Sequence, residues 1–278
     1  MKGTAYKIKK GLLYTFLILL GATCLLPFLL MIVNATRSGS EIARSFTFIP
    51  GKNLKENWET VFDYFNLFEG MWNSIKVAVP ATLLTAYFSA LTAYALAMYK
   101  FKGCNVIFGT ILVFMMIPGQ LGLIGFYNLC TKLHLVNSYI PLIIPAMAAP
   151  GTVFFLSQYT ISSLSKSLND AARIDGAGEL YSFHKIALPI MAPGLATMGI
   201  MAFIGNWNSY LLPMIVLNKN NKFTLPVMMA SLNASTDIQA NQGAIYLSVA
   251  ISVIPILLVF AFFSKYIISS ISAGAVKE

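Results

Sequence analysis

The stretch that decides the fold runs from Leu168 to Pro189 and reads LNDAARIDGAGELYSFHKIALP. It gathers Asp, Glu, Arg, Lys and one of the two histidines, His184, in a chain that is otherwise largely apolar. Such a segment could be an active site, an interfacial loop or a surface that binds another protein. The residues on either side of it decide among these alternatives.

Local signals in this stretch predict two short helices. Ser167 with Asp170 three residues later fits a capping box at the start of the first helix. Gly176 is placed to end that helix in a left-handed conformation. A second helix is expected over residues 179–187, where apolar residues recur at helical spacing, and Pro189 is expected to turn the chain into the next apolar segment.

The composition is that of an integral membrane protein. The 278 residues are 57% hydrophobic and 10% charged, with a mean hydropathy of +0.72, whereas soluble domains carry about 25% charged residues. The net charge of +9 does not indicate nucleic acid, because no basic stripe is interleaved with aromatic residues. In a membrane protein, excess Lys and Arg mainly sets the orientation of the spans.

The cysteines indicate neither a metal site nor a disulfide framework. Cys24, Cys104 and Cys130 form no CxxC pair and no Cys/His spacing. The N-terminus has a basic start followed by an apolar run over residues 11–33. That run is longer than the roughly 7–15 residues of a signal-peptide core, so we interpret it as a retained first span.

Six segments are long and apolar enough to cross a membrane, which needs about 20 residues. They are residues 12–33, 75–98, 106–127, 139–159, 194–216 and 244–267. Proline and glycine interrupt several of them, which membrane helices tolerate when neighbours satisfy the freed backbone groups. The prediction is an all-α, polytopic membrane protein that forms a single transmembrane domain over residues 1–278.

Basic residues orient these spans. Four lysines lie in the first ten residues, and Lys100 and Lys102 follow the second span; short basic segments are typical of the cytoplasmic side. With six spans, both termini are then cytoplasmic, as tails of residues 1–11 and 268–278. The loop of residues 34–74 is extracellular, and the loop of residues 160–193, which holds the opening stretch, is cytoplasmic.

Several classes of function lack the residues they require. There is no GxxxxGK[ST] nucleotide-binding motif, since Gly51-Lys52 is followed by Asn53. The six predicted spans contain no Asp or Glu, and His134 and His184 both fall in loops. Ion-coupled carriers usually place ionisable groups within the membrane, which argues against a self-powered carrier without excluding it. We expect no enzyme activity and no catalytic residue.

The spacing within the opening stretch resembles the EAA loop of binding-protein-dependent ABC importer permeases. That loop has Glu-Ala-Ala, three residues, Gly, nine residues, Ile, one residue and Leu-Pro. Here the same positions are Asp170-Ala171-Ala172, Gly176, Ile186 and Leu188-Pro189. The one departure is Asp170 in place of Glu, which keeps the carboxylate and shortens its reach by one methylene.

Other segments are similar to the carbohydrate-uptake branch of this family. They are RIDGA (173–177), WNSYLLP (207–213), MIPGQ (116–120) and NSIKVA (73–78). The terminal SAGAVK (272–277) resembles the tail of the smaller permease subunit of maltose importers. The resemblance extends over essentially the whole chain.

The resemblance implies a permease subunit of an ATP-driven importer that moves a di- or oligosaccharide across the bacterial cytoplasmic membrane by alternating access. A coupling helix between spans four and five would dock on a cytoplasmic ATPase. The expected partners are a second, different permease, two ATPase copies, an extracellular solute-binding protein and membrane lipid. No cofactor is expected on this chain, since ATP and Mg would bind the ATPase.

The same resemblance implies which residues meet the ATPase. The expected coupling residues are Asp170, Ala171, Ala172, Asp175, Gly176, Ala177, Ile186, Leu188 and Pro189. The C-terminal tail could touch the ATPase through Ser272, Gly274 and Val276, or could be an ordinary chain end. His184 falls among the nine unspecified positions and is expected to be a surface residue.

Polar residues in two of the spans are candidates for a sugar pathway. They are Gln120, Asn206, Trp207, Asn208, Ser209 and Tyr210. Trp207 could stack on a sugar ring. The alternative is that Asn and Ser bond to neighbouring helices and that Tyr and Trp lie at the membrane interface.

Two other functions remain open at this point. One is a permease of the same architecture that imports a different solute, such as a polyamine or phosphonate. The other is a secondary carrier that works alone, which uptake by this chain without any ATPase would support.

Overall fold

The computed structural model describes residues 2–234 and 241–275, and every element in these two ranges is a helix. The chain folds as two compact units. Unit 1 comprises Met1–Phe68 and Met228–Ile254, and unit 2 comprises Glu69–Val227 and Pro255–Glu278. The units are described separately below.

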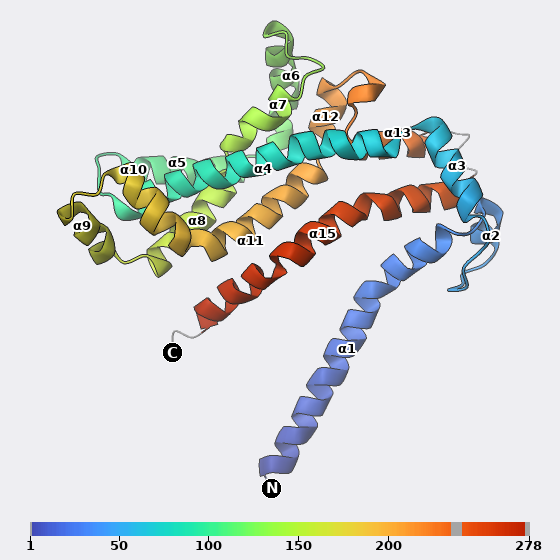
Figure 1. The fold of residues 1–278 in the computed structure, drawn as a ribbon, viewed down its shortest axis with the longest axis horizontal. Coiled ribbons are helices and arrows are strands. Elements are labelled where there is room, and N and C mark those ends of the chain that lie inside the picture. Colours follow the sequence, from blue (N-terminus) through green and yellow to red (C-terminus); the bar gives the residue numbers. More distant parts are fainter. Residues whose placement is uncertain (1, 235–240, 276–278) are drawn as a thin grey trace. The chain divides into compact units, whose positions relative to one another are not determined.

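Unit 1 joins the first span to the start of the last one. Its helices are α1 (Lys2–Asn34), α2 (Gly39–Arg44), α3 (Leu54–Tyr64), most of α13 (Leu225–Ala234) and the first part of α15 (Gln242–Ala275). Helix α2 starts at a complete capping box, in which Ser38 and Glu41 bond to each other's backbone N–H groups. Within this unit, α2 and α3 lie where the end of α1 meets the start of α15 (Figure 1).

Buried polar groups hold the connection after α1 in place. The Arg37 guanidinium is buried and donates to the backbone oxygens of Glu41 at 2.7 Å and Ser45 at 3.0 Å. The amide of Asn57, also buried, donates to the carbonyls of Ala35 at 2.8 Å and Arg37 at 3.0 Å. Gly243, at the start of α15, packs directly against this group of atoms.

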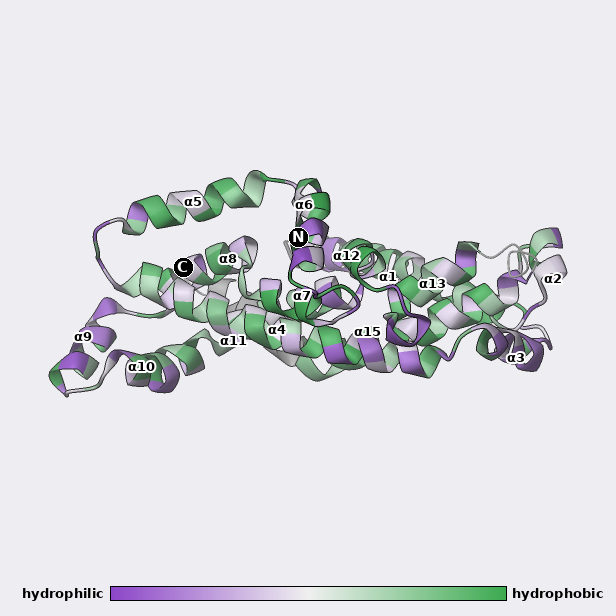
Figure 2. Ribbon diagram, turned by 90° about the horizontal axis from the view of Figure 1, so that it is seen from above, coloured by the Kyte–Doolittle hydropathy of each residue, from purple (hydrophilic) through white to green (hydrophobic). Residues whose placement is uncertain are grey.

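Unit 2 contains the remaining helices. They are α4 (Leu67–Met98), α5 (Cys104–Met116), η1 (Gly119–Gly122), α6 (Leu123–Lys132), α7 (Ile140–Ile143), η2 (Ile144–Met147), α8 (Pro150–Ser163), α9 (Lys166–Ile174), α10 (Glu179–Ser182), η3 (Phe183–Ala187), α11 (Leu188–Trp207), α12 (Leu211–Val216) and η4 (Asn220–Lys222). Helices α9 and α10 lie at the C-terminal end of α4 (Figure 1). Figure 2 shows hydrophobic residues along most of α5 and hydrophilic residues gathered on α9.

Proline breaks two of the apolar segments of unit 2. The chain bends by 88° between α5 and the η1–α6 segment, where Pro118 precedes η1. Pro150 starts α8 and has no N–H to offer the carbonyl of Ala146, four residues earlier. The Thr85 hydroxyl of α4 donates to that carbonyl at 2.7 Å instead, so a neighbouring helix satisfies the group that proline leaves free.

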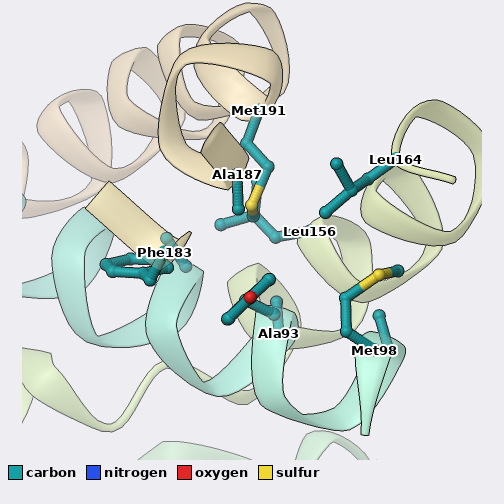
Figure 3. Close-up of a cluster of buried hydrophobic side chains, with 10 residues drawn as sticks. Ala93, Met98, Leu156, Leu164, Phe183, Ala187 and Met191 are labelled. Carbon is teal, nitrogen blue, oxygen red and sulfur yellow. The ribbon is translucent and has the colours of Figure 1, made fainter. Parts of the chain in front are cut away.

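A buried apolar cluster joins one end of α4 to the loop of residues 160–193. Its side chains come from α4, α8, η3 and α11 (Figure 3). The members are Ala90, Ala93, Tyr94, Ala97, Met98, Leu156, Leu164, Phe183, Ala187 and Met191. Small alanines on α4 let neighbouring helices approach closely, which is typical of packing in membranes. The same device occurs between α8 and α11, where the Tyr159 ring occupies the space beside Gly194.

The all-helical prediction is confirmed for the described residues. Five helices are long and apolar enough to cross a membrane, and there are six if the bent pair α5 and η1–α6 is counted as one. The fifth predicted span, residues 194–216, divides differently: one helix runs from Glu179 to Trp207, and Leu211–Val216 forms the separate α12. Polar residues at 208–210 interrupt the helix at that point.

Candidate functional site

The first helix of the opening stretch is α9, and its cap lies two residues before the predicted one. Ser165 is the N-cap, and its hydroxyl accepts from the Leu168 N–H at 3.3 Å. The predicted capping box of Ser167 and Asp170 is therefore wrong. Both serines match the N-cap preference, and the local pattern did not distinguish them.

Gly176 ends α9 as predicted. Its φ is +80°, in the left-handed region where a side chain is strained. The Gly176 N–H bonds to Arg173 O at 3.0 Å and the Ala177 N–H bonds to Ala172 O at 2.9 Å. This pair of bonds is a Schellman motif, which satisfies the last carbonyls of the helix.

The Ala pair divides between the two sides of α9. Ala171 is exposed with Asp170, whereas Ala172 is buried and packs toward the bundle with Asn169. Successive helix residues differ by about 100° in direction, and at Ala172 this turn brings the side chain onto the face that packs on the bundle. Of the pair, only Ala171 lies on the exposed surface.

The rest of the expected coupling residues divide in the same way. Asp175, Gly176 and Pro189 are exposed, while Ala177, Ile186 and Leu188 are half-buried. Ile186 and Leu188 belong to the segment that packs on the bundle and not to its outer surface.

The second helix does not end at Pro189, and that prediction is wrong. Helix α10 continues through the π-helical η3 into α11. Pro189 therefore lies inside a continuous helix, directly after the π-helical turn, and it has no N–H to donate to the preceding turn. The Leu188 N–H bonds to Phe183 O, five residues back. This wider turn keeps the helix continuous from the polar loop into the apolar segment, and π-turns of this kind frequently mark functional sites.

Four large apolar side chains of this polar loop are exposed, which the sequence pattern did not predict. Ile174, the last residue of α9, is 86% exposed, and Leu168 of α9 and Leu180 and Tyr181 of α10 are also exposed. Apolar groups on an exposed polar segment indicate a surface that binds another protein. Ile174 lies between Arg173 and Asp175, and an isoleucine between two charges at a helix end is the signal that could have found it.

His184 is exposed, as predicted, and is also held in place. Its Nδ1 lies 2.7 Å from Leu180 O, and its Nε2 lies 3.2 Å from the Tyr87 hydroxyl of α4. The loop between α4 and α5 lies beside the coupling region as well, since Lys100 and Lys166 line one hollow of about 410 Å3.

The candidate pathway residues gather where two apolar helices break. The η1 segment brings Gln120 to the break after α11, so that Gln120, Asn208, Ser209 and Tyr210 line one open groove of about 370 Å3. Asn206 and Ser209 line a second, smaller cavity of about 160 Å3 that also contains the buried Thr224 hydroxyl. Transporters typically bind substrates at such helix breaks.

Trp207 does not belong to this groove. Its side chain is 2% exposed, and its ring stacks on Phe203 with centroids 5.7 Å apart. Both the burial and the neighbouring ring support a packing role for Trp207 over the sugar-stacking alternative. Its spacing of four residues from Phe203 places the two rings on one helix face.

The C-terminal candidates are described only in part. Ser272 and Gly274 lie in α15, and Val276 lies outside the described residues.

Among the residues that the structure describes, no group of His, Cys, Asp and Glu could hold a metal ion.

Comparison with known proteins gives a consistent result. Residues 83–273 match the model of the family described as "Binding-protein-dependent transport system inner membrane component". The chain is 37% identical to the arabinooligosaccharides transport system permease protein of Halalkalibacterium halodurans over 90% of each chain. It is 31% identical to the diacetylchitobiose uptake system permease protein of Streptomyces coelicolor, over 94% of this chain and 87% of that one.

A solved structure shows the same fold. It is a bacterial ABC transporter involved in the import of the acidic polysaccharide alginate, and one of its chains matches with a TM-score of 0.77 and 23% identity. The match covers 92% of this chain and 96% of that one. Together with the family match over most of the sequence, these findings show that the chain belongs to the inner membrane components of binding-protein-dependent transport systems.

Proposed function

We propose that this chain is one permease subunit of an ATP-driven importer that moves a di- or oligosaccharide across the cytoplasmic membrane by alternating access. The observation that carries this is the loop of residues 168–189, with the family's spacing, a helix whose outer side is free and a continuous helical path into α11. The names of the relatives, which refer to arabinooligosaccharides and diacetylchitobiose, support a sugar substrate.

The partners follow from the family. A binding-protein-dependent importer works with an ATPase and a solute-binding protein. We further propose that two ATPase copies and a second, different permease complete the complex. ATP and Mg would then bind the ATPase and not this chain.

The orientation is part of the proposal. Six spans would cross the membrane, with the bent α5 and η1–α6 pair as the third and both termini in the cytoplasm. The nearness of Lys100, Lys166 and the coupling loop supports one basic, cytoplasmic end of unit 2.

The coupling residues are proposed to act through the exposed side of α9 and α10. Asp170, Ala171 and Asp175 would face the ATPase together with Ile174 and the apolar residues of α10. The remaining coupling residues, Ala172, Gly176, Ala177, Ile186, Leu188 and Pro189, would shape the loop and join it to the bundle. The tail residues Ser272, Gly274 and Val276 remain proposed contacts.

The groove at the helix breaks is proposed as this subunit's part of the sugar pathway. It presents neutral amide and hydroxyl groups from Gln120, Asn208, Ser209 and Tyr210, which suit a neutral polyol. Asn206 would contribute from the adjoining cavity.

Vesicles that contain this chain, its second permease and its ATPase, supplied with binding protein, test the function. We expect uptake of labelled oligosaccharide that requires ATP. Asn208→Leu should lower the uptake rate about tenfold, the equivalent of one lost hydrogen bond, with normal assembly. Asn105→Leu, an exposed asparagine outside the groove, is the matched control.

Two outcomes would contradict the proposal. Uptake without the ATPase would identify a secondary carrier. ATP-dependent uptake of a polyamine or phosphonate, with no uptake of sugar, would identify a permease for a different solute.

Gly176→Val is expected to abolish coupled transport while the spans still insert. A β-branched residue at φ +80° is strained by about 1–2 kcal/mol or more, so the Schellman turn opens and α9 loses its position. Gly176→Asn is the matched control, because asparagine tolerates this backbone conformation. Sugar uptake and ATP hydrolysis measured on the same vesicles check this prediction. Normal coupling in Gly176→Val would show that transport does not require the left-handed turn at Gly176.

A further inference from the structure

Two buried polar side chains meet inside the apolar cluster between α4 and the coupling loop. Tyr94 of α4 is 3% exposed and Asn169 of α9 is 5% exposed. The Tyr94 hydroxyl donates to Asn169 Oδ1 at 2.6 Å, and the Tyr94 ring packs against Phe183 with centroids 5.5 Å apart. A buried hydrogen bond of this kind is costly to break, because each partner would be left unsatisfied.

A second hydrogen bond lies beside this one, nearer the surface. The Tyr99 oxygen lies 2.9 Å from that of Tyr94, but each hydroxyl has one proton, and Tyr99 donates its own to the Glu179 carboxylate. Arg173 Nε donates to Glu179 Oε1 at 3.1 Å, and the Arg173 guanidinium lies 5.0 Å from the centre of the Tyr99 ring. Burial, followed by the hydrogen bonds to Glu179 and Tyr94, raises the pKa of Tyr99, so that its hydroxyl keeps the proton it donates.

These two bonds, Tyr94 to Asn169 and Tyr99 to Glu179, tie both arms of the loop to one end of α4. Asn169 and Arg173 belong to α9, and Glu179 starts α10. Tyr94 lies in the last turns of α4, and Tyr99 follows that helix directly.

Helix α9 has little else to hold it. Its buried residues are Asn169 and Ala172, and an alanine methyl contributes little apolar area. Hydrophobic packing therefore cannot by itself fix the position of α9 on the bundle. The bond from Asn169 to Tyr94 is the specific attachment between this helix and α4.

We propose that Tyr94 and Asn169 are positioning residues that fasten the coupling helix to α4, so that movement of α9 by the ATPase is transmitted to that span. The inference rests on the proposed function, because it assigns how the coupling loop passes on the movement. The bond from Tyr99 to Glu179 attaches α10 to the same end of α4. A loop tied in this way moves with α4 instead of pivoting at Gly176.

The complete transporter in vesicles provides the test, with sugar uptake and ATP hydrolysis measured together. Tyr94→Phe keeps the ring in the cluster and removes only the hydroxyl. We expect the complex to assemble and to hydrolyse ATP, while the sugar transported per ATP falls about fivefold or more, the usual range for loss of coupling between sites. Asn169→Leu should do the same, and the double variant should be no worse than either single one, because both remove the same bond.

Tyr139→Phe is the matched control. Its hydroxyl also makes one long-range hydrogen bond, to Lys222 O at 3.2 Å, but outside the coupling region. The sugar transported per ATP should be unchanged in this variant. If Tyr94→Phe fails to assemble, Asn169→Leu tests the same bond from its other partner on α9, with a loss in the same direction expected.

The outcomes separate the two proposals. An unchanged ratio in Tyr94→Phe, or in Asn169→Leu where Tyr94→Phe does not assemble, would overturn the positioning role and leave the importer assignment intact. Equal and additive losses from Tyr94→Phe and Asn169→Leu would also overturn it, since the two residues would then act independently. A wild-type complex that transports no sugar would instead contradict the proposed function.

Discussion

Ile174→Asp is expected to weaken the assembly of this permease with its ATPase about 30-fold or more, while the permease itself stays folded. Ile174 is 86% exposed at the end of α9, so the substitution disturbs no internal contact. At a docked interface, the same change removes an apolar anchor and buries an unpaired carboxylate beside Asp175. Loss of a central anchor residue costs about 2 kcal/mol or more, which weakens binding roughly 30-fold.

Co-purification of the ATPase and its affinity for the permease check this prediction. Asn218→Asp adds the same charge at an exposed position between α12 and η4, outside the coupling loop and the hollow beside it, and should bind normally. The thermal unfolding of the Ile174→Asp permease should match that of the wild type. Normal ATPase affinity in this variant would show that the end of α9 is not part of the docking surface.

Gly243→Ala is expected to destabilise unit 1 strongly. A Cβ atom at Gly243 would lie 2.0 Å from the Arg37 carbonyl oxygen and 2.5 Å from Asn57 Nδ2. The Asn57 amide is bonded to that same oxygen and to Ala35 O, so neither group can move without breaking a buried hydrogen bond. Overpacking costs about 1–3 kcal/mol, and unsatisfied buried polar groups add about 1–3 kcal/mol.

A fall in the thermal unfolding temperature of the purified permease, with a lower yield of folded protein, measures this effect. Gly21→Ala in α1 is the control, because no atom lies within 4 Å of the added Cβ. Each variant adds one methyl group to a glycine of unit 1. Equal stability of both would mean that the start of α15 does not pack on Arg37.

The sequence was informative where the physical cause is local. The apolar runs indicated a helical membrane protein because a span needs an unbroken stretch of apolar residues. Gly176 indicated a left-handed helix end because glycine adopts that conformation without strain. The spacing from Asp170 to Pro189 indicated the family for the same reason, since all its positions lie within one loop.

Local reasoning failed where two signals of equal strength competed. Ser165 and Ser167 are equally good N-caps, and the sequence pattern favoured the wrong one. The sequence pattern predicted a helix break before Pro189, but a π-turn lets the helix continue through this residue. Trp207 was a candidate for stacking on a sugar, but the direction of its side chain depends on how α11 packs in the bundle.

The sequence by itself therefore determined the class of fold, the position of the coupling loop and the turn at Gly176, since each depends on residues that are neighbours in the chain. Only the tertiary structure decided that Ala172 faces inward, that Asn169 bonds to Tyr94 and that Gln120 meets Asn208 in one groove. It alone decided that Gly243 must be a glycine because Arg37 lies against it. These contacts join residues tens to hundreds of positions apart, and they exist only once particular helices have packed together.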